Sequence, residues 1–157
     1  MLKTIYFAFA LLFFGVATAQ DAPPIVVETD YSSPLTIVSG ETEHSLLVEI
    51  ADTRETITSG MMHRPEMAAD VGMLFIREEA RFDGFWMRNT LVSLDIMFLA
   101  DDGEIMSIAH NAVPLSESNI APGVAVRYIL EIKGGQAEIL GIKPGDIVRH
   151  ERLQNNG

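Results

Sequence analysis

The sequence FWMRNT at residues 85–90, followed after two residues by SLDIMF at residues 93–98, carries the strongest structural signal in this chain. It places the only Trp, a cation, an amide and a carboxylate within eleven positions of an otherwise apolar segment. From residue 94 to residue 99, alternation puts apolar side chains on both faces of a strand, and Asp95 is the exception. A carboxylate in apolar surroundings must be paired, hydrogen-bonded or protonated. The stretch therefore predicts a buried strand that encloses one acid.

Turn signals divide most of the chain into short strands. Helices are expected only at residues 53–62 and Gln136–Leu140, and residues 113–124 read as a long loop. No βαβ rhythm or glycine-rich phosphate loop is present, so a parallel nucleotide-binding sheet is not expected. The predicted fold is mainly β, a single compact β-sandwich or partly open β-barrel with one or two short helices. The expected strands are Leu35–Val38, His44–Ala51, Gly72–Ile76, Phe85–Arg88, Leu94–Ala100, Glu104–Ala109, Val126–Lys133 and Ile147–Glu151.

The first nineteen residues have the pattern of a secretory signal peptide. Lys3 precedes an apolar run from Ile5 to Val16, which is shorter than the roughly 20 residues of a membrane-spanning helix. Residues 17–19, Ala-Thr-Ala, then form a small-x-small cleavage site. We expect cleavage after Ala19, no membrane span afterwards, and a periplasmic or secreted protein. The remaining chain is predicted to have three parts, namely an extended leader at 20–42, a β domain at 43–152 and a frayed tail at 153–157.

Charge and cysteine content narrow the functional classes. The chain has a net charge of −11, and loss of Lys3 with the signal peptide leaves 10 basic against 22 acidic residues. Such an acidic surface repels nucleic acid and anionic lipid, which bind through clustered Lys and Arg. The chain contains no Cys, so thiol catalysis, thiolate metal sites and disulfides do not arise.

Five stretches, in the expected order, resemble the DUF192 family. Two differences from the usual family pattern are Met61 in place of Leu, which conserves volume, and Ser93 in place of Pro. The resemblance extends over about residues 43–148. It implies a small, compact, β-rich secreted or periplasmic domain and no particular reaction, because the family has no established activity. The stretches are the opening block at 85–98, GMMHR at 60–64, GMLF at 72–75, YILEI at 128–132 with the following Gly-Gly, and GIKPGD at 141–146.

Two acids, Asp95 and Glu131, lie in apolar strands and allow two interpretations. In the first, they form an acid/base pair of the kind that glycoside hydrolases use. In the second, which we favour, they are structural groups that pair with arginines or accept backbone N–H groups. The sequence offers no other catalytic candidate, since it lacks a Gly-x-Ser-x-Gly elbow and a Cys nucleophile.

Trp86 and Asn89 also allow two interpretations. A lone Trp between Phe85 and Met87 is usually buried in a core, although its ring could also stack on a sugar or a peptide. Asn89 fits a turn between two strands, or a binding group if it faces a cleft.

The leading functional hypothesis is a binding or accessory module of the periplasm or cell envelope. Its partner would be a small ligand, a glycan or an envelope protein, and a glycan or cell-wall hydrolase is the alternative. No cofactor is expected, nor a metal, because the four histidines lack ligand spacing. The candidate binding residues are Arg64, Trp86, Arg88, Asn89, Asp95 and Glu131, bordered by the 113–124 loop.

Overall fold

A computed structural model describes residues 29–153 of the chain. The predicted signal peptide and the first nine residues of the predicted leader lie outside the described residues, as do the last four residues of the predicted tail. Within residues 29–153, no helix is long and apolar enough to cross a membrane. Two short helices are present, and both coincide with predicted ones: α1 (Arg54–Ser59) and α2 (Gln136–Leu140).

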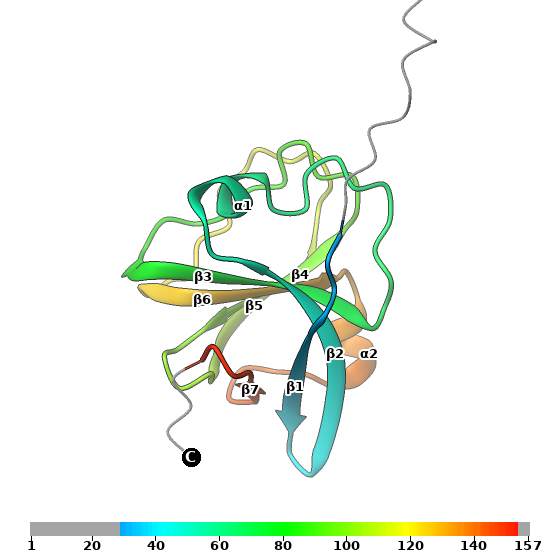
Figure 1. Ribbon diagram of the computed structural model, residues 1–157, viewed down its shortest axis with the longest axis vertical. Coiled ribbons are helices and arrows are strands. Elements are labelled where there is room, and N and C mark those ends of the chain that lie inside the picture. Colours follow the sequence, from blue (N-terminus) through cyan, green and yellow to red (C-terminus); the bar gives the residue numbers. More distant parts are fainter. Residues whose placement is uncertain (1–28, 154–157) are drawn as a thin grey trace, which may run out of the picture.

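Seven strands form one strongly curled sheet (Figure 1). Their order across the sheet is β5-β4-β6-β3-β2-β1-β7. The two edges approach each other, because Glu104 next to β5 forms a bridge with Ile147 of β7. The sheet is therefore a half-barrel, which confirms the prediction of a mainly β, partly open barrel. The strands are β1 (Ser33–Ser39), β2 (Thr42–Ala51), β3 (Val71–Arg81), β4 (Leu94–Leu99), β5 (Ile105–Ala112), β6 (Val126–Lys133) and β7 (Ile147–Arg149).

The N-terminal boundary of the domain differs from the prediction. Strand β1 pairs with β2 on one side and with β7 on the other, and its Leu35 and Ile37 side chains are buried in the core. Residues 33–42 are therefore part of the sheet and not of an extended leader. The pattern of β1 is too short for sequence alone to show that it is paired on both sides.

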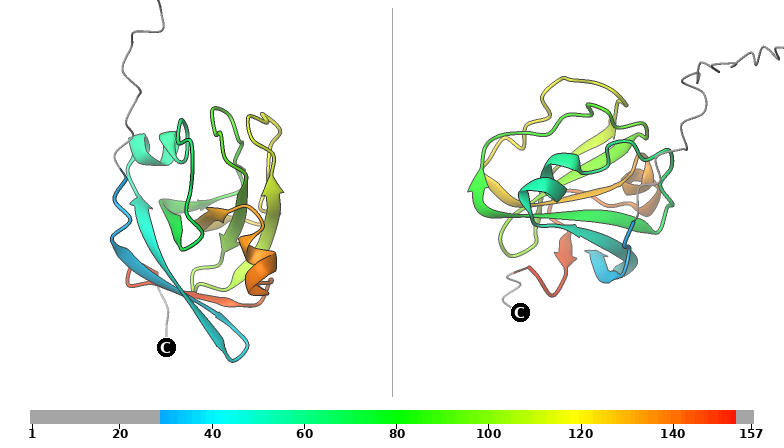
Figure 2. Two further views of the ribbon diagram at one scale, coloured as in Figure 1. Left: turned by 90° about the vertical axis from the view of Figure 1, so that its right-hand side faces the viewer. Right: turned by 45° about the horizontal axis from the view of Figure 1, so that its top comes forward.

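The sheet contains one parallel pair, β2 with β3, although the other pairs are antiparallel. The chain between these two strands forms α1 and the following turn, so β2, α1 and β3 make a single βαβ unit. The expectation that the chain has no βαβ unit is therefore wrong, because a helix of only six residues leaves little helical pattern in the sequence. The connection lies over one end of the half-barrel, beside the loops at 82–93 and 113–125 (Figures 1 and 2).

Alternation along the strands separates two hydrophobic clusters, one on each face of the sheet. On β3, Leu74 belongs to the first cluster, whereas Met73 and Phe75 belong to the second. The first cluster is completed by Ala137 of α2 and by the C-terminal segment. The second lies under the α1 connection, which contributes Met61 and Met67. The two candidate residues that lie on strands, Asp95 and Glu131, can thus be assigned to a face.

Candidate functional site

Asp95 is fully buried, and two backbone amides hold it. Its Oδ1 accepts a hydrogen bond from the Asn111 N–H of β5, and its Oδ2 accepts one from the Ala137 N–H, each at 2.8 Å. Ala137 lies in the first turn of α2, and the preceding Gly135 has no side chain to cap this helix. Asp95 supplies the missing cap from β4. Both carboxylate oxygens are occupied, so Asp95 connects β4, β5 and α2.

Glu131 of β6 is buried to a similar degree, with 4% of its surface exposed, but it is not satisfied in the same way. Within residues 29–153, its carboxyl group accepts no hydrogen bond and forms no ion pair. Burial raises the pKa of Glu131 to about 8, and attraction to Arg64 offsets only part of this effect. At neutral pH Glu131 therefore holds its proton most of the time.

The two acids lie on opposite faces of the sheet. Asp95 stands opposite Ile132 on the neighbouring strand, whereas Glu131 stands opposite Ile96. Paired residues share a face and consecutive residues alternate, so one carboxyl group points toward each hydrophobic cluster. The predicted acid/base pair is therefore wrong, because the sheet separates the two groups. The hydrolase alternative that depended on this pair loses its basis.

Arg64 lies on the Glu131 face and forms a bidentate ion pair with Glu49. Its Nη1 and Nη2 donate to the Glu49 carboxylate at 2.7 and 2.9 Å, and Nη1 also donates to the Tyr31 hydroxyl at 3.1 Å. Burial lowers the pKa of Arg64, but hydrogen bonds and attraction from Glu49 and Tyr31 outweigh it and raise the pKa above its ordinary value. The charge of Arg64 is thus matched by Glu49, and its buried Nε has no hydrogen-bond partner among residues 29–153.

A cavity of about 40 Å³ lies beside Glu131. One wall is residues 57–62, the carboxyl end of α1 and the turn that follows. Aromatic rings line the rest, and two of them, Phe75 and Phe85, meet edge to face with centroids 5.1 Å apart. Glu131 is the only titratable residue in this lining, which also includes Thr90 and Trp86. The cavity combines an acid without a hydrogen-bond partner among residues 29–153 with walls of mixed hydroxyl and apolar side chains.

Gly60 allows the α1 end of this wall to pack closely. It ends the helix with a φ of +43°, a backbone conformation that L side chains rarely adopt. A Cβ at this position would lie 3.2 Å from the Phe75 ring. The GMMHR stretch therefore begins with Gly for two reasons, the turn and the close approach to an aromatic ring.

Backbone hydrogen bonds join three segments around the cavity. The His63 N–H donates to Asn89 O at 2.8 Å, which joins the 60–64 turn to the 85–90 segment. Phe85 and Ile120 exchange two backbone hydrogen bonds, and further bonds join the same two loops near Met87 and Thr90. Residues 85–88 are therefore not the predicted strand but a loop, supported by the long loop at 113–125.

Trp86 is 52% exposed, so the expected burial in the core is wrong. Trp86 lines the cavity, and the guanidinium carbon of exposed Arg88 lies 5.7 Å from the ring centroid. Asn89 is exposed with a φ of +57°, as its turn position predicts, and its Nδ2 lies 3.9 Å from Met62 Sδ. Of the six candidates, Arg64, Trp86, Arg88, Asn89 and Glu131 lie on or near this end of the molecule, and only Asp95 does not.

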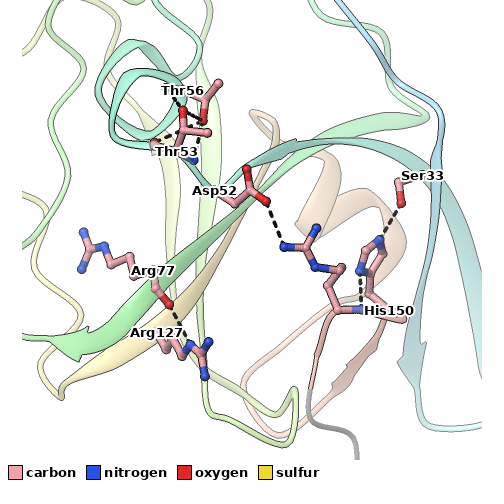
Figure 3. A network of polar contacts seen from close by, with 8 residues as sticks. Ser33, Asp52, Thr53, Thr56, Arg77, Arg127 and His150 are labelled. Carbon is pink, nitrogen blue, oxygen red and sulfur yellow. Dashed lines mark hydrogen bonds and ion pairs between the residues drawn. The ribbon is translucent and has the colours of Figure 1, made fainter.

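A larger cavity of about 550 Å³ lies on the other side of α1. It is lined by three arginines and three acids, so it has no net charge preference. Arg77 is buried there, and burial lowers its pKa more than attraction to Asp83 raises it. In Figure 3 its backbone oxygen accepts a hydrogen bond from Arg127 Nε, at 2.7 Å. The hydrogen bond between Arg127 and Arg77 joins β6 to the C-terminal half of β3.

Figure 3 also shows a polar network that ties the C-terminal segment to the sheet. His150 Nδ1 accepts a hydrogen bond from the Arg152 N–H at 3.1 Å, so Nε2 carries the hydrogen and donates to Ser33 Oγ at 2.9 Å. Burial lowers the pKa of His150, which is consistent with a neutral ring. Arg152 also pairs with Asp52 at 2.9 Å. The network has a structural role.

The described residues contain no group of three or more His, Asp or Glu side chains placed to hold a metal ion. Two partners in the site were not among the sequence candidates, namely Glu49 and Tyr31. Glu49 had a detectable signal in the sequence, because it lies between Val48 and Ile50 in the predicted strand His44–Ala51. Tyr31 gave none, because it lies outside any strand.

Comparisons with solved structures find similar proteins of unassigned activity. A crystal structure from Sinorhizobium meliloti 1021, described as a candidate transcription regulator, is 38% identical with a TM-score of 0.74, and the match covers 79% of this chain and 98% of that chain. A protein of unknown function from Novosphingobium aromaticivorans DSM 12444 is also 38% identical with a TM-score of 0.74, covering 86% of this chain and 99% of that one. No curated protein matches the chain.

The sequence profile of DUF192, described as an uncharacterised ACR family, matches residues 36–150. This range contains all seven strands except the first three residues of β1, together with both helices and the Glu131 cavity. The chain therefore belongs to the DUF192 family.

Proposed function

We propose that this protein is an exported binding module of the cell envelope, and that it holds its ligand in the Glu131 cavity. The observation that carries the proposal is the state of Glu131, an acid that is buried without a hydrogen-bond partner within residues 29–153. A carboxyl group that no protein donor satisfies keeps its capacity to accept hydrogen bonds from a ligand. A ligand gains no comparable hydrogen bonds at Asp95, because both of its carboxylate oxygens already accept backbone N–H groups.

The exposed position of Trp86 supports the same proposal. An aromatic ring with half of its surface in water costs hydrophobic energy unless another molecule covers it. Trp86 also lines the cavity that contains Glu131. The rim could therefore contact the outer part of a ligand whose end reaches the acid.

Transcription regulation, which the description of the Sinorhizobium structure names, receives no support from this chain. Its net charge of −11 opposes contact with phosphates. Export is supported by the signal-peptide pattern of residues 1–19. Mass spectrometry of the protein from a periplasmic fraction tests this part, and we expect a chain that begins at Gln20.

The binding proposal is tested with a library of small soluble fragments and amide chemical shifts. We expect the binding fragments to shift signals of residues 57–62 and 85–90, and Trp86→Ala and Glu131→Gln to weaken them at least tenfold. Glu138→Gln, the same charge change on an exposed acid of α2 outside the cavity, serves as the control. Shifts that map to other surfaces, or affinities that neither variant changes, would overturn the proposal.

A further inference from the structure

We infer that the Glu131 cavity takes a primary ammonium group, R–NH₃⁺, with the remainder of the ligand lying over Trp86. This inference rests on the proposed function of the same cavity and names the chemical class of its ligand. Primary ammonium groups occur in lysine side chains, amino sugars and polyamines, and the inference concerns the chemistry that these sources share.

The charges around the site are one positive group short. Glu49 and Glu131 lie in one row across the sheet, since each pairs with Met73 of the intervening strand. Arg64 is the cation nearest to both, and its two terminal nitrogens are committed to Glu49. When Glu131 ionises, this row has two negative charges against one positive charge. A ligand cation would supply the missing charge in place of the proton that Glu131 otherwise holds.

The aromatic residues that line the cavity suit a cation, as the Glu131 carboxylate does. Phe75, Phe85 and Trp86 line the cavity, and the faces of such rings attract ammonium groups. The carboxyl end of α1 adds a small effect of the same sign, because this end of a helix carries negative partial charge.

The volume suits a small head group. A water molecule needs about 10–15 Å³ of such a cavity, so 40 Å³ admits a head group of few heavy atoms. An –NH₃⁺ group on its first carbon fits this space. The three N–H donors can reach the Glu131 carboxylate and the hydroxyl of buried Thr90, whose contact with Arg88 O is long at 3.5 Å.

Few charged groups can influence Glu131 from the surrounding elements. The α1 connection contributes Arg64, β2 contributes Glu49, and the 82–93 loop contributes Arg88 at the rim. Asp95 of β4 lies on the other face of the sheet, and Arg77 of β3 stacks on the outer side of Phe85. We therefore expect the pH dependence of ligand binding at this site to follow the protonation of Glu131.

The test titrates the purified protein with n-butylammonium at constant ionic strength, with n-butanol as the neutral analogue. Trp86 is the only Trp, so its fluorescence reports binding at the rim directly. We expect the ammonium compound to bind at least tenfold more tightly than the alcohol at pH 8. Its affinity should rise about tenfold per pH unit between pH 5 and pH 7 and level off above pH 8, with release of one proton.

Glu131→Gln should remove the preference for the ammonium compound, whereas Glu138→Gln, on exposed α2, should leave it unchanged. Parallel titrations with glucosamine, Nα-acetyl-lysine amide and putrescine then rank the three sources. Tighter binding of n-butanol, or affinity that falls as the pH rises, would overturn the inference, because Glu131 would then act as a protonated donor. If other fragments bind the cavity while ammonium compounds do not, this inference fails and the proposed binding function stands.

Discussion

Asp95 and Glu131 are both buried acids on adjacent strands of one sheet, yet they differ in almost every physical respect. Asp95 points to the α2 face, where two backbone N–H groups saturate it. Glu131 points to the α1 face, where aromatic rings and a cavity surround it. The difference shows that burial alone does not identify a functional acid. A better indicator is the number of carboxyl oxygens that already accept hydrogen bonds from the protein. An acid whose oxygens accept none can still accept them from a ligand.

The largest effect is expected from Asp95→Ala. The substitution leaves the N–H groups of Asn111 and Ala137 without an acceptor and uncaps α2, so the free energy of unfolding should fall by about 3–5 kcal/mol. Urea unfolding followed by circular dichroism measures this loss. Asp95→Asn should cost less, because its amide oxygen can still accept one bond. A loss below about 1 kcal/mol for the Ala variant would remove the distinction between the two acids.

Glu131→Gln should change the pH dependence of stability. Because the folded pKa is raised, the unfolded state releases the proton first, and the contribution of Glu131 to stability is lost as pH rises from 4.5 to about 8. Relative to Glu131→Gln, the native protein should therefore lose about 3 kcal/mol between pH 5 and pH 8. Urea unfolding at both pH values measures the difference. If the variant were instead the less stable protein at pH 8, Glu131 would be a paired structural acid like Asp95.

Arg64→Met tests the partner that holds Glu49. Removing the guanidinium leaves a mostly buried carboxylate without its cation, which should cost about 2–3 kcal/mol. The pKa of Glu131 should rise further, because its one stabilising charge is gone. Carbon-detected NMR titration of the carboxyl groups measures this change. Arg88→Met, at an exposed site, serves as the control and should change neither quantity appreciably.

Trp86→Ala should have the smallest effect on stability. Half of the ring is already in water, so the free energy of unfolding should change by about 1 kcal/mol or less. Ligand affinity should nevertheless fall, which separates the rim of the cavity from the core. A loss of several kcal/mol would mean that Trp86 supports the packing of the 82–93 loop.

The strands were largely predictable because their evidence is local. Leu94–Leu99 and Val126–Lys133 show it in their apolar alternation, and Gln136–Leu140 was predicted with the observed bounds. The face that each acid occupies was not predictable, because it depends on register: a one-residue shift of β4 against β6 would place Asp95 beside Glu131. Residues 85–88 looked like a strand because they are apolar, but their partners Ser116 and Ile120 offer only scattered backbone bonds.

The structure of α1 has a consequence for motion. None of its six residues is fully buried, and Gly60 ends it. Elements with so little buried apolar surface open at lower free energy than the strands beneath them. We expect amides of α1 to exchange with solvent through local openings, while those of β3 and β6 exchange only when the whole domain unfolds. Residues 57–59 of this helix line the cavity beside Glu131, so such openings would widen the space through which a molecule enters or leaves.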